Sequence, residues 1–140
     1  MFLKSPVNFS SGRRNKKEPP VKEDHLALNT ILYCGKWEET LRFYRSLLDN
    51  PGDWLAEWCV EFSISETARL SVADENRASI RSAGGKGLTL SIRVRNIDRE
   101  WTRLQEAGLV PDAIRRHPWG AKVFYLHDPE GNRIEIWTPG

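Results

Sequence analysis

The chain has 140 residues, of which 39% are hydrophobic and 29% charged, and its 21 basic and 19 acidic side chains leave a formal net charge of +2. This length suits one compact domain, and no stretch reaches the ~18–20 apolar residues that a membrane-spanning helix needs. The chain starts without the apolar segment of a secretory signal, so we expect a cytoplasmic protein with no membrane partner. Cys34 and Cys59 match no metal-binding spacing and are expected to be reduced thiols.

Residues 1–24 differ in composition from the rest of the chain. They carry six basic and three acidic side chains, contain Ser, Gly and Pro, and lack apolar periodicity. Such a segment buries too little surface to offset its ordering entropy, so we predict a disordered basic tail. The run RRNKK at 13–17 is typical of segments that contact nucleic acid or anionic lipid. A solvated leader is the simpler interpretation, and we do not expect a nucleic-acid partner.

The next part of the chain combines predicted strands with one amphipathic helix. Strand composition is found at 26–34, 54–64 and 68–73, and the second of these stretches fits either one long strand or two short ones. A helix is predicted at 37–48, because its large apolar side chains recur at spacings of three and four: Trp37, Leu41, Tyr44 and Leu48.

The last part of the chain repeats this order after a glycine-containing linker. Its predicted strands lie at 88–95, 112–116, 121–127 and 132–138. Its predicted helix, 97–107, ends at Gly108 and places Ile97, Trp101 and Leu104 on one face. The turn DPEG at 128–131 separates the last two strands, since Pro and Gly supply the dihedral angles that a turn needs.

A fixed shift superimposes the two halves. Moving the chain by 60 residues lays Leu32 on Ile92 and Tyr44 on Leu104, and moving the later strands by 64 lays 69–72 on 133–136. Both strands and both helix faces match, so two similar half-domains are the simplest explanation. In this arrangement Trp37 and Trp101 are expected to be core residues.

Two segments of the chain resemble the vicinal oxygen chelate superfamily, which includes glyoxalases, bleomycin-resistance proteins and extradiol dioxygenases. They are FYLHDPEGNRIEIW (124–137) and ILYCGKWEETLRFYRSLL (31–48). The resemblance covers 26–138 and implies an α+β fold with two βαβββ modules, 25–83 and 84–140. The modules would form a partly open, barrel-like cavity within a single domain. Members of this family commonly pair, so the resemblance also implies a homodimer.

In the metal-using members, the ligands come from the first and last strands of each module. The resemblance places these positions at Asn29 and Ser71 in the first module, and at Thr89 (Ser91 if the register slips) and Glu135 in the second. Transition metals are held by imidazole, thiolate or carboxylate, and neutral amides and hydroxyls are weak replacements. We therefore expect no tightly bound metal and no other cofactor.

Glu135 is the candidate catalytic residue. Alternation along IEIW turns Ile134 and Ile136 towards the helices and Glu135 to the opposite side of the strand. If that side is the cavity, partial desolvation raises the pKa of Glu135 and suits it to act as a general base. A structural ion pair with Arg133 or Arg69 is an equal alternative.

The candidate ligand-binding residues are polar or aromatic side chains near the implied cavity: Asn29, Tyr33, Trp58, Thr89, His117, Trp119 and Trp137. Aromatic side chains combine apolar area with a polar group and suit a planar or amphipathic ligand. Ordinary packing accounts for about half of these aromatics. His117 lies in a loop that the resemblance places at the cavity mouth, although a solvated loop histidine is the simpler interpretation.

The leading functional prediction is a small-molecule-binding protein of the glyoxalase/bleomycin-resistance type that works without metal. The alternative is a glyoxalase- or isomerase/lyase-like enzyme, in which Glu135 is the base for a carbonyl substrate. Asn29 or a weakly held divalent metal would then polarise the substrate oxygen. A third possibility is a vestigial site in a protein whose role is interaction.

Overall fold

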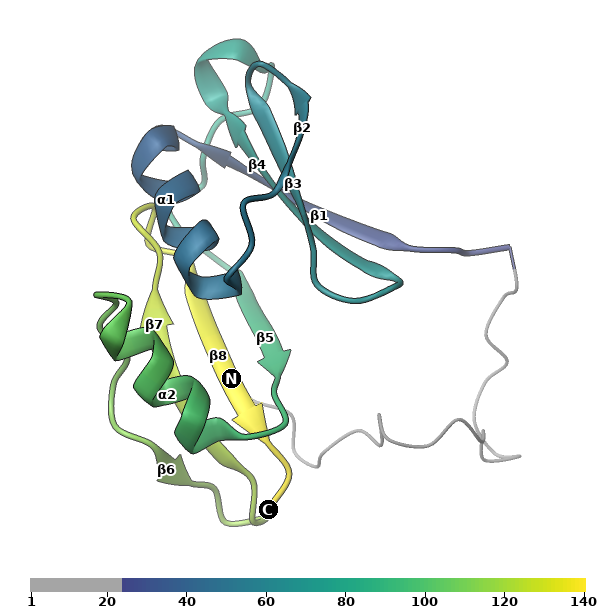
Figure 1. Ribbon diagram of the computed structural model, residues 1–140. Helices are drawn as coiled ribbons and strands as arrows, with labels where there is room; N and C mark the ends of the chain where they lie inside the picture. Colours follow the sequence, from purple (N-terminus) through teal and green to yellow (C-terminus); the bar gives the residue numbers. More distant parts are fainter. Residues whose placement is uncertain (1–23) are drawn as a thin grey trace.

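The computed structural model describes residues 24–140, and the predicted tail lies outside the described residues except for Asp24 (Figure 1). The first half contains β1 (Leu28–Cys34), α1 (Trp37–Leu48), β2 (Asp53–Ala56), β3 (Cys59–Ser63), β4 (Ala68–Asp74) and a 3-10 turn (Glu75–Arg77). The second half contains β5 (Thr89–Arg93), α2 (Ile97–Glu106), β6 (Arg115–Arg116), β7 (Lys122–His127) and β8 (Arg133–Thr138). Neither helix of residues 24–140 is long and apolar enough to cross a membrane.

The eight strands form two four-stranded sheets, ordered β1-β4-β3-β2 and β5-β8-β7-β6. In each sheet the first strand runs parallel to the last strand of its module, and the other pairs are antiparallel. Asn29 pairs with Arg69, and Thr89 pairs with Arg133. The shifts of 60 and 64 residues thus superimpose the β1–β4 pairing on the β5–β8 pairing. This confirms the predicted α+β fold of two βαβββ modules.

Two predicted strands differ from the structure in their extent. The stretch 54–64 is two strands, because the chain turns at Glu57 and Trp58 and the pairing register shifts between Trp54 and Ala56. The stretch 112–116 shortens to the two residues of β6. There the side chain of Asp112 accepts the backbone N–H of Tyr125 at 2.7 Å, in place of a strand carbonyl.

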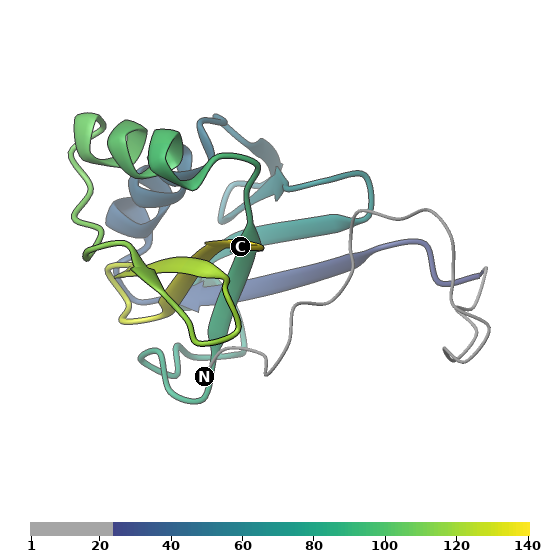
Figure 2. The same ribbon diagram turned by 90° about the horizontal axis from the view of Figure 1, so that it is seen from below.

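One hydrophobic core joins the two modules. It is built from the helix-facing side chains of both sheets and the inner faces of both helices, with Tyr44, Val72, Leu104 and Ile134 among its fully buried members. Trp37 and Trp101 pack against this core and are partly buried. In Figure 1 α2 lies below α1, whose end contacts it, and the sheets splay apart without joining into a closed barrel (Figures 1 and 2).

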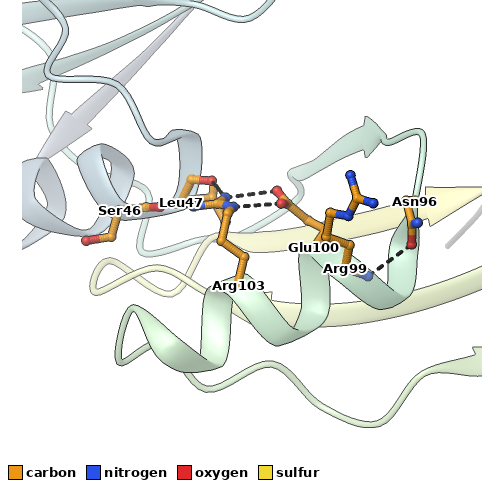
Figure 3. A network of polar contacts seen from close by, with 6 residues as sticks. All are labelled: Ser46, Leu47, Asn96, Arg99, Glu100 and Arg103. Atoms are coloured by element: carbon orange, nitrogen blue, oxygen red, sulfur yellow. Dashed lines mark hydrogen bonds and ion pairs between the residues drawn. The ribbon is translucent and has the colours of Figure 1, made fainter.

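Helix α1 is capped at both ends by side chains of the second module. At its start, the Glu130 carboxylate accepts the backbone N–H groups of Gly35 at 2.9 Å and Lys36 at 2.7 Å. At its end, the Arg103 guanidinium donates to the carbonyl oxygens of Ser46 and Leu47 (Figure 3). An anion at the start and a cation at the end both complement the helix dipole. The first module therefore depends on the second for the completion of its helix.

The DPEG turn supplies the first of these caps and a second contact between the modules. Asp128 is buried and accepts hydrogen bonds from the Tyr44 hydroxyl of α1 at 2.6 Å and from the Asn132 amide at 2.9 Å. Partial burial favours the protonated form of Glu130, but hydrogen bonds, those from Gly35 and Lys36 among them, outweigh it and lower the pKa of this carboxyl. This turn thus holds α1 in place from the other module.

Candidate functional site

A buried carboxylate lies at the centre of the second sheet, on the face turned away from the helices. Ser91 on β5, Glu135 on β8 and Tyr125 on β7 stand opposite one another on neighbouring strands. One oxygen of Glu135 accepts the Ser91 hydroxyl at 2.7 Å, and the other accepts the Tyr125 hydroxyl at 3.0 Å. Ile134 and Ile136 belong to the helix-facing core, as alternation predicted. Glu135 is 1% exposed, so its carboxylate is shielded from solvent.

The alternative ion pairs of Glu135 are not formed. Arg133 directs its Nε to the Thr89 hydroxyl at 3.0 Å, and its guanidinium lies over the Tyr125 ring, 5.0 Å from the ring centroid. Arg69 lies 3.9 Å from Glu61 and donates to the carbonyls of the β3–β4 turn. The Glu135 carboxylate thus accepts hydrogen bonds from two neutral hydroxyls and forms no ion pair with Arg133 or Arg69.

Tyr125 is held as a hydrogen-bond donor. Its partial burial disfavours the phenolate, and the adjacent carboxylate of Glu135 adds to this effect, so the pKa of Tyr125 is raised above its ordinary value. The hydroxyl therefore keeps its proton to a higher pH than a solvent-exposed tyrosine does.

The equivalent positions of the first module form a separate pair. The Ser71 hydroxyl donates to the Asn29 side-chain oxygen at 3.0 Å, and Ser71 is fully buried. The hydrogen bonds of Thr89 and Glu135 likewise remain inside their own module. No three His, Cys, Asp or Glu side chains within 24–140 are grouped as a metal centre would require. One carboxylate with neutral amide and hydroxyl donors does not fit a tightly held transition metal.

A groove runs between the two modules, and we call it the inter-module groove. Its volume is about 450 Å³, and its lining residues are Ile64, Ser65, Ala68, Ser91, Ile92, Arg93 and Trp137. Most of this lining is apolar, with Ser91 connecting the groove to the carboxylate of Glu135. A smaller hollow of about 140 Å³ shares part of the lining and extends it to Leu28, Arg69 and Leu90. Grooves of this size and composition suit small organic ligands.

The structure brings two of the predicted ligand-binding residues near Glu135. Trp137 follows it on the same strand face and lines the inter-module groove, with Arg93 lying 5.6 Å from its ring centroid. Thr89 lies on the same face as Ser91, one pair further along the sheet, where it accepts the hydrogen bond of Arg133.

The predicted residues of the first module lie elsewhere. Tyr33 shares a strand face with Asn29, as predicted, but it lines a different hollow of about 310 Å³ beside the linker residues Ile80 and Lys86. Trp58 lies in the turn between β2 and β3, and none of the hollows described above has it in its lining. Tyr33 and Trp58 do not line a common cavity, and their role in ligand binding stays a prediction.

His117 and Trp119 form a stacked pair in the β6–β7 turn. Their ring centroids are 4.5 Å apart, and the ring planes differ by 7°. This turn connects Arg116 of β6 to Lys122 of β7, which pair with each other. Lys122 in turn pairs with Thr138 of β8. Thr138 is three residues beyond Glu135, or ~10 Å along the strand. The pair therefore lies near the end of the second sheet rather than at the carboxylate.

Sequence reasoning left out Tyr125, which holds one oxygen of Glu135. A signal for it was present in the DPEG turn. Five residues, the DPEG turn and Asn132, separate β7 from β8 and set His127 opposite Arg133, and moving two residues away from the turn on each strand sets Tyr125 opposite Glu135. Ser91, kept as the alternative to Thr89, is the residue of β5 that contacts the carboxylate.

Comparison with known proteins agrees with this architecture. Residues 23–136 match the model of the Glyoxalase/Bleomycin resistance protein/Dioxygenase superfamily, and the chain belongs to this family. Among curated proteins, it is similar to the uncharacterized protein YraH of Bacillus subtilis (strain 168), at 27% identity over 79% of this chain and 95% of YraH.

Solved structures share the fold at low sequence identity. A glyoxalase/bleomycin resistance protein from Catenulispora acidiphila has a TM-score of 0.70 at 21% identity, covering 82% of this chain and 99% of its own. A lactoylglutathione lyase from Agrobacterium tumefaciens has a TM-score of 0.65 at 20% identity, covering 86% of this chain and 96% of its own. These likenesses confirm the resemblance seen in the sequence and extend to the fold alone.

Proposed function

We propose that the protein binds a small organic molecule in the inter-module groove without a metal ion. The observation that carries this proposal is the position of Ser91, which lines an otherwise largely apolar groove while its hydroxyl is fixed by buried Glu135. An apolar lining with a few well-placed polar groups is the usual composition of a ligand site.

Burial of Glu135 favours binding over catalysis. A general base must come within hydrogen-bond distance of the proton that it removes. Here each carboxylate oxygen already accepts a hydroxyl proton, and the residue is 1% exposed. In this proposal the hydroxyls of Ser91 and Tyr125 hold Glu135 in place, and Ser91, which lines the groove, faces the ligand.

A binding test uses substitutions that leave the fold intact. Thermal shifts over a panel of small aromatic and carbonyl compounds identify a ligand, and calorimetry measures its affinity. Ile64, which lines the groove, is 37% exposed, so Ile64→Gln should be folded. It should bind the ligand about tenfold more weakly, because apolar contact area is lost. Val110 is 86% exposed and lies outside the groove lining, so Val110→Gln is the matched control. Equal affinity in both variants would refute groove binding.

The enzyme alternative draws on the relative named as a lactoylglutathione lyase. It assigns Glu135 as the base for a carbonyl substrate, and its probe is the hemithioacetal of methylglyoxal and glutathione. We expect no lactoylglutathione product, with or without added zinc or nickel. Elemental analysis should find well under one equivalent of transition metal, given the donor set. Turnover that disappears in Glu135→Gln would instead establish the alternative.

We also propose a cytoplasmic homodimer. An apolar side chain exposed on β1 outside the groove supports the dimer, since Ile31 is 44% exposed. Cys34 and Cys59 are buried, unpaired thiols, and this state favours a reducing compartment. Sedimentation equilibrium measures the subunit number, and a monomer at micromolar concentration would contradict the dimer.

A further inference from the structure

Arg133 presents a fixed guanidinium on the same sheet face as the carboxylate. Its Nε donates to the Thr89 hydroxyl at 3.0 Å, and its guanidinium carbon lies over the Tyr125 ring, 5.0 Å from the ring centroid. The residue is half-buried, so the group is partly shielded from water but still accessible. These contacts occupy one edge and one face of the guanidinium, and within residues 24–140 its terminal amino groups form no hydrogen bond or ion pair.

The positive charge of Arg133 is not neutralised by a carboxylate of residues 24–140. Glu135 lies two residues further on the same face, yet its oxygens accept the hydroxyls of Ser91 and Tyr125. Arg69 occupies the equivalent position in the first module and is used differently, since it lies beside Glu61 and donates to turn carbonyls. Of the two repeat-related arginines, only Arg133 keeps its terminal donors available for a ligand.

We propose that Arg133 binds the anionic group of the ligand, so that the protein selects small planar monoanions such as aromatic carboxylates. This inference rests on the proposed function of the inter-module groove. A guanidinium matches a carboxylate with two parallel hydrogen bonds, and this geometry favours carboxylate over a neutral amide. Arg133 lies beside the groove rather than in its lining: it occupies the position diagonal to Ser91, which lines the groove, on the neighbouring strand, roughly 7 Å away. A single ring bearing a carboxylate spans this separation, with the carboxylate on Arg133 and the ring towards Ser91 and Trp137.

The test compares benzoate with benzamide, which has nearly the same shape without the charge. Binding of each compound is measured by calorimetry or by NMR titration of the full chain. We expect benzoate to bind at least tenfold more tightly than benzamide. Arg133→Gln should remove this preference by weakening benzoate alone, and Arg133→Lys should keep part of it, because the charge remains while the paired donors are lost. Arg99→Gln removes the same charge from an exposed position of α2 and should leave both affinities unchanged.

The outcomes separate this inference from the proposal on which it rests. Equal binding of benzoate and benzamide, unchanged in Arg133→Gln, would overturn the anion site and leave the groove as a binding site for neutral molecules. Loss of preference in Arg99→Gln as well would also overturn it, because the effect would then be one of net charge. Absence of benzoate binding up to millimolar concentrations would overturn the anion site too. In that case, a neutral compound from the panel that discriminates Ile64→Gln from Val110→Gln would still support the groove.

Discussion

Replacing Tyr44 with Phe tests the contact between α1 and the DPEG turn. The substitution keeps the buried ring and removes only the hydroxyl that donates to Asp128 at 2.6 Å. A hydrogen bond to a charged acceptor contributes about 1.5–3 kcal/mol to the free energy of unfolding. Asp128 keeps its other donors, among them the Asn132 amide, so we expect a loss of about 2 kcal/mol. In a domain of this size that loss lowers the melting temperature by roughly 5–8 °C.

Urea denaturation measures this effect, and the transition should shift to lower urea with an unchanged slope. Tyr33→Phe is the matched control, because within residues 24–140 no hydrogen bond is recorded for the Tyr33 hydroxyl. It should change the free energy of unfolding by less than about 0.5 kcal/mol. If Tyr44→Phe is as stable as Tyr33→Phe, the buried contact to Asp128 contributes nothing and our account of the module interface is wrong.

Three further predictions concern stability. Arg103→Met removes the cap from the end of α1 and should cost about 1 kcal/mol, whereas Arg99→Met should be nearly neutral in the same urea titration. Trp37→Ala and Trp101→Ala should each cost about 3 kcal/mol, and calorimetric melting that finds only one of them destabilised would contradict their equivalence in the repeat. Burial raises the pKa of Cys34 from 9.0 to about 12, so the unfolded thiol ionises first and stability falls as the pH rises above about 9. The loss should reach about 1 kcal/mol near pH 10, and Cys34→Ala should lack this part of the pH dependence.

Local patterns were sufficient for most of the fold. The spacing of apolar residues predicted α1 with its observed bounds, Trp37–Leu48. Alternation on β8 placed Glu135 on the face opposite Ile134, and the shifts of 60 and 64 residues predicted that the two modules are equivalent. These features depend on neighbours within one strand or helix, or on a repeat visible in the chain.

The surroundings of Glu135 were less accessible to the same reasoning. The sequence allowed Glu135 to be either a general base or the ion-pair partner of Arg69 or Arg133. The charges of these residues do not show which donors reach the Glu135 carboxylate. The choice depends on the Ser91 and Tyr125 hydroxyls, which only the pairing of three strands brings together. The cap from Glu130 to Gly35 was equally hidden, since 95 residues separate its partners and no periodic pattern connects them.

That cap also bears on the order in which the chain becomes structured during synthesis. Glu130 follows Gly35, which lies just ahead of the helix Trp37–Leu48, by 95 residues. When the first module leaves the ribosome, the residues that cap α1 and hold Tyr44 have not yet been made. We therefore expect α1 to remain unstable until the β7–β8 hairpin forms, so that the two modules become stable together in one cooperative step. A chain truncated before the DPEG turn should consequently lose protection of the α1 amides from hydrogen exchange.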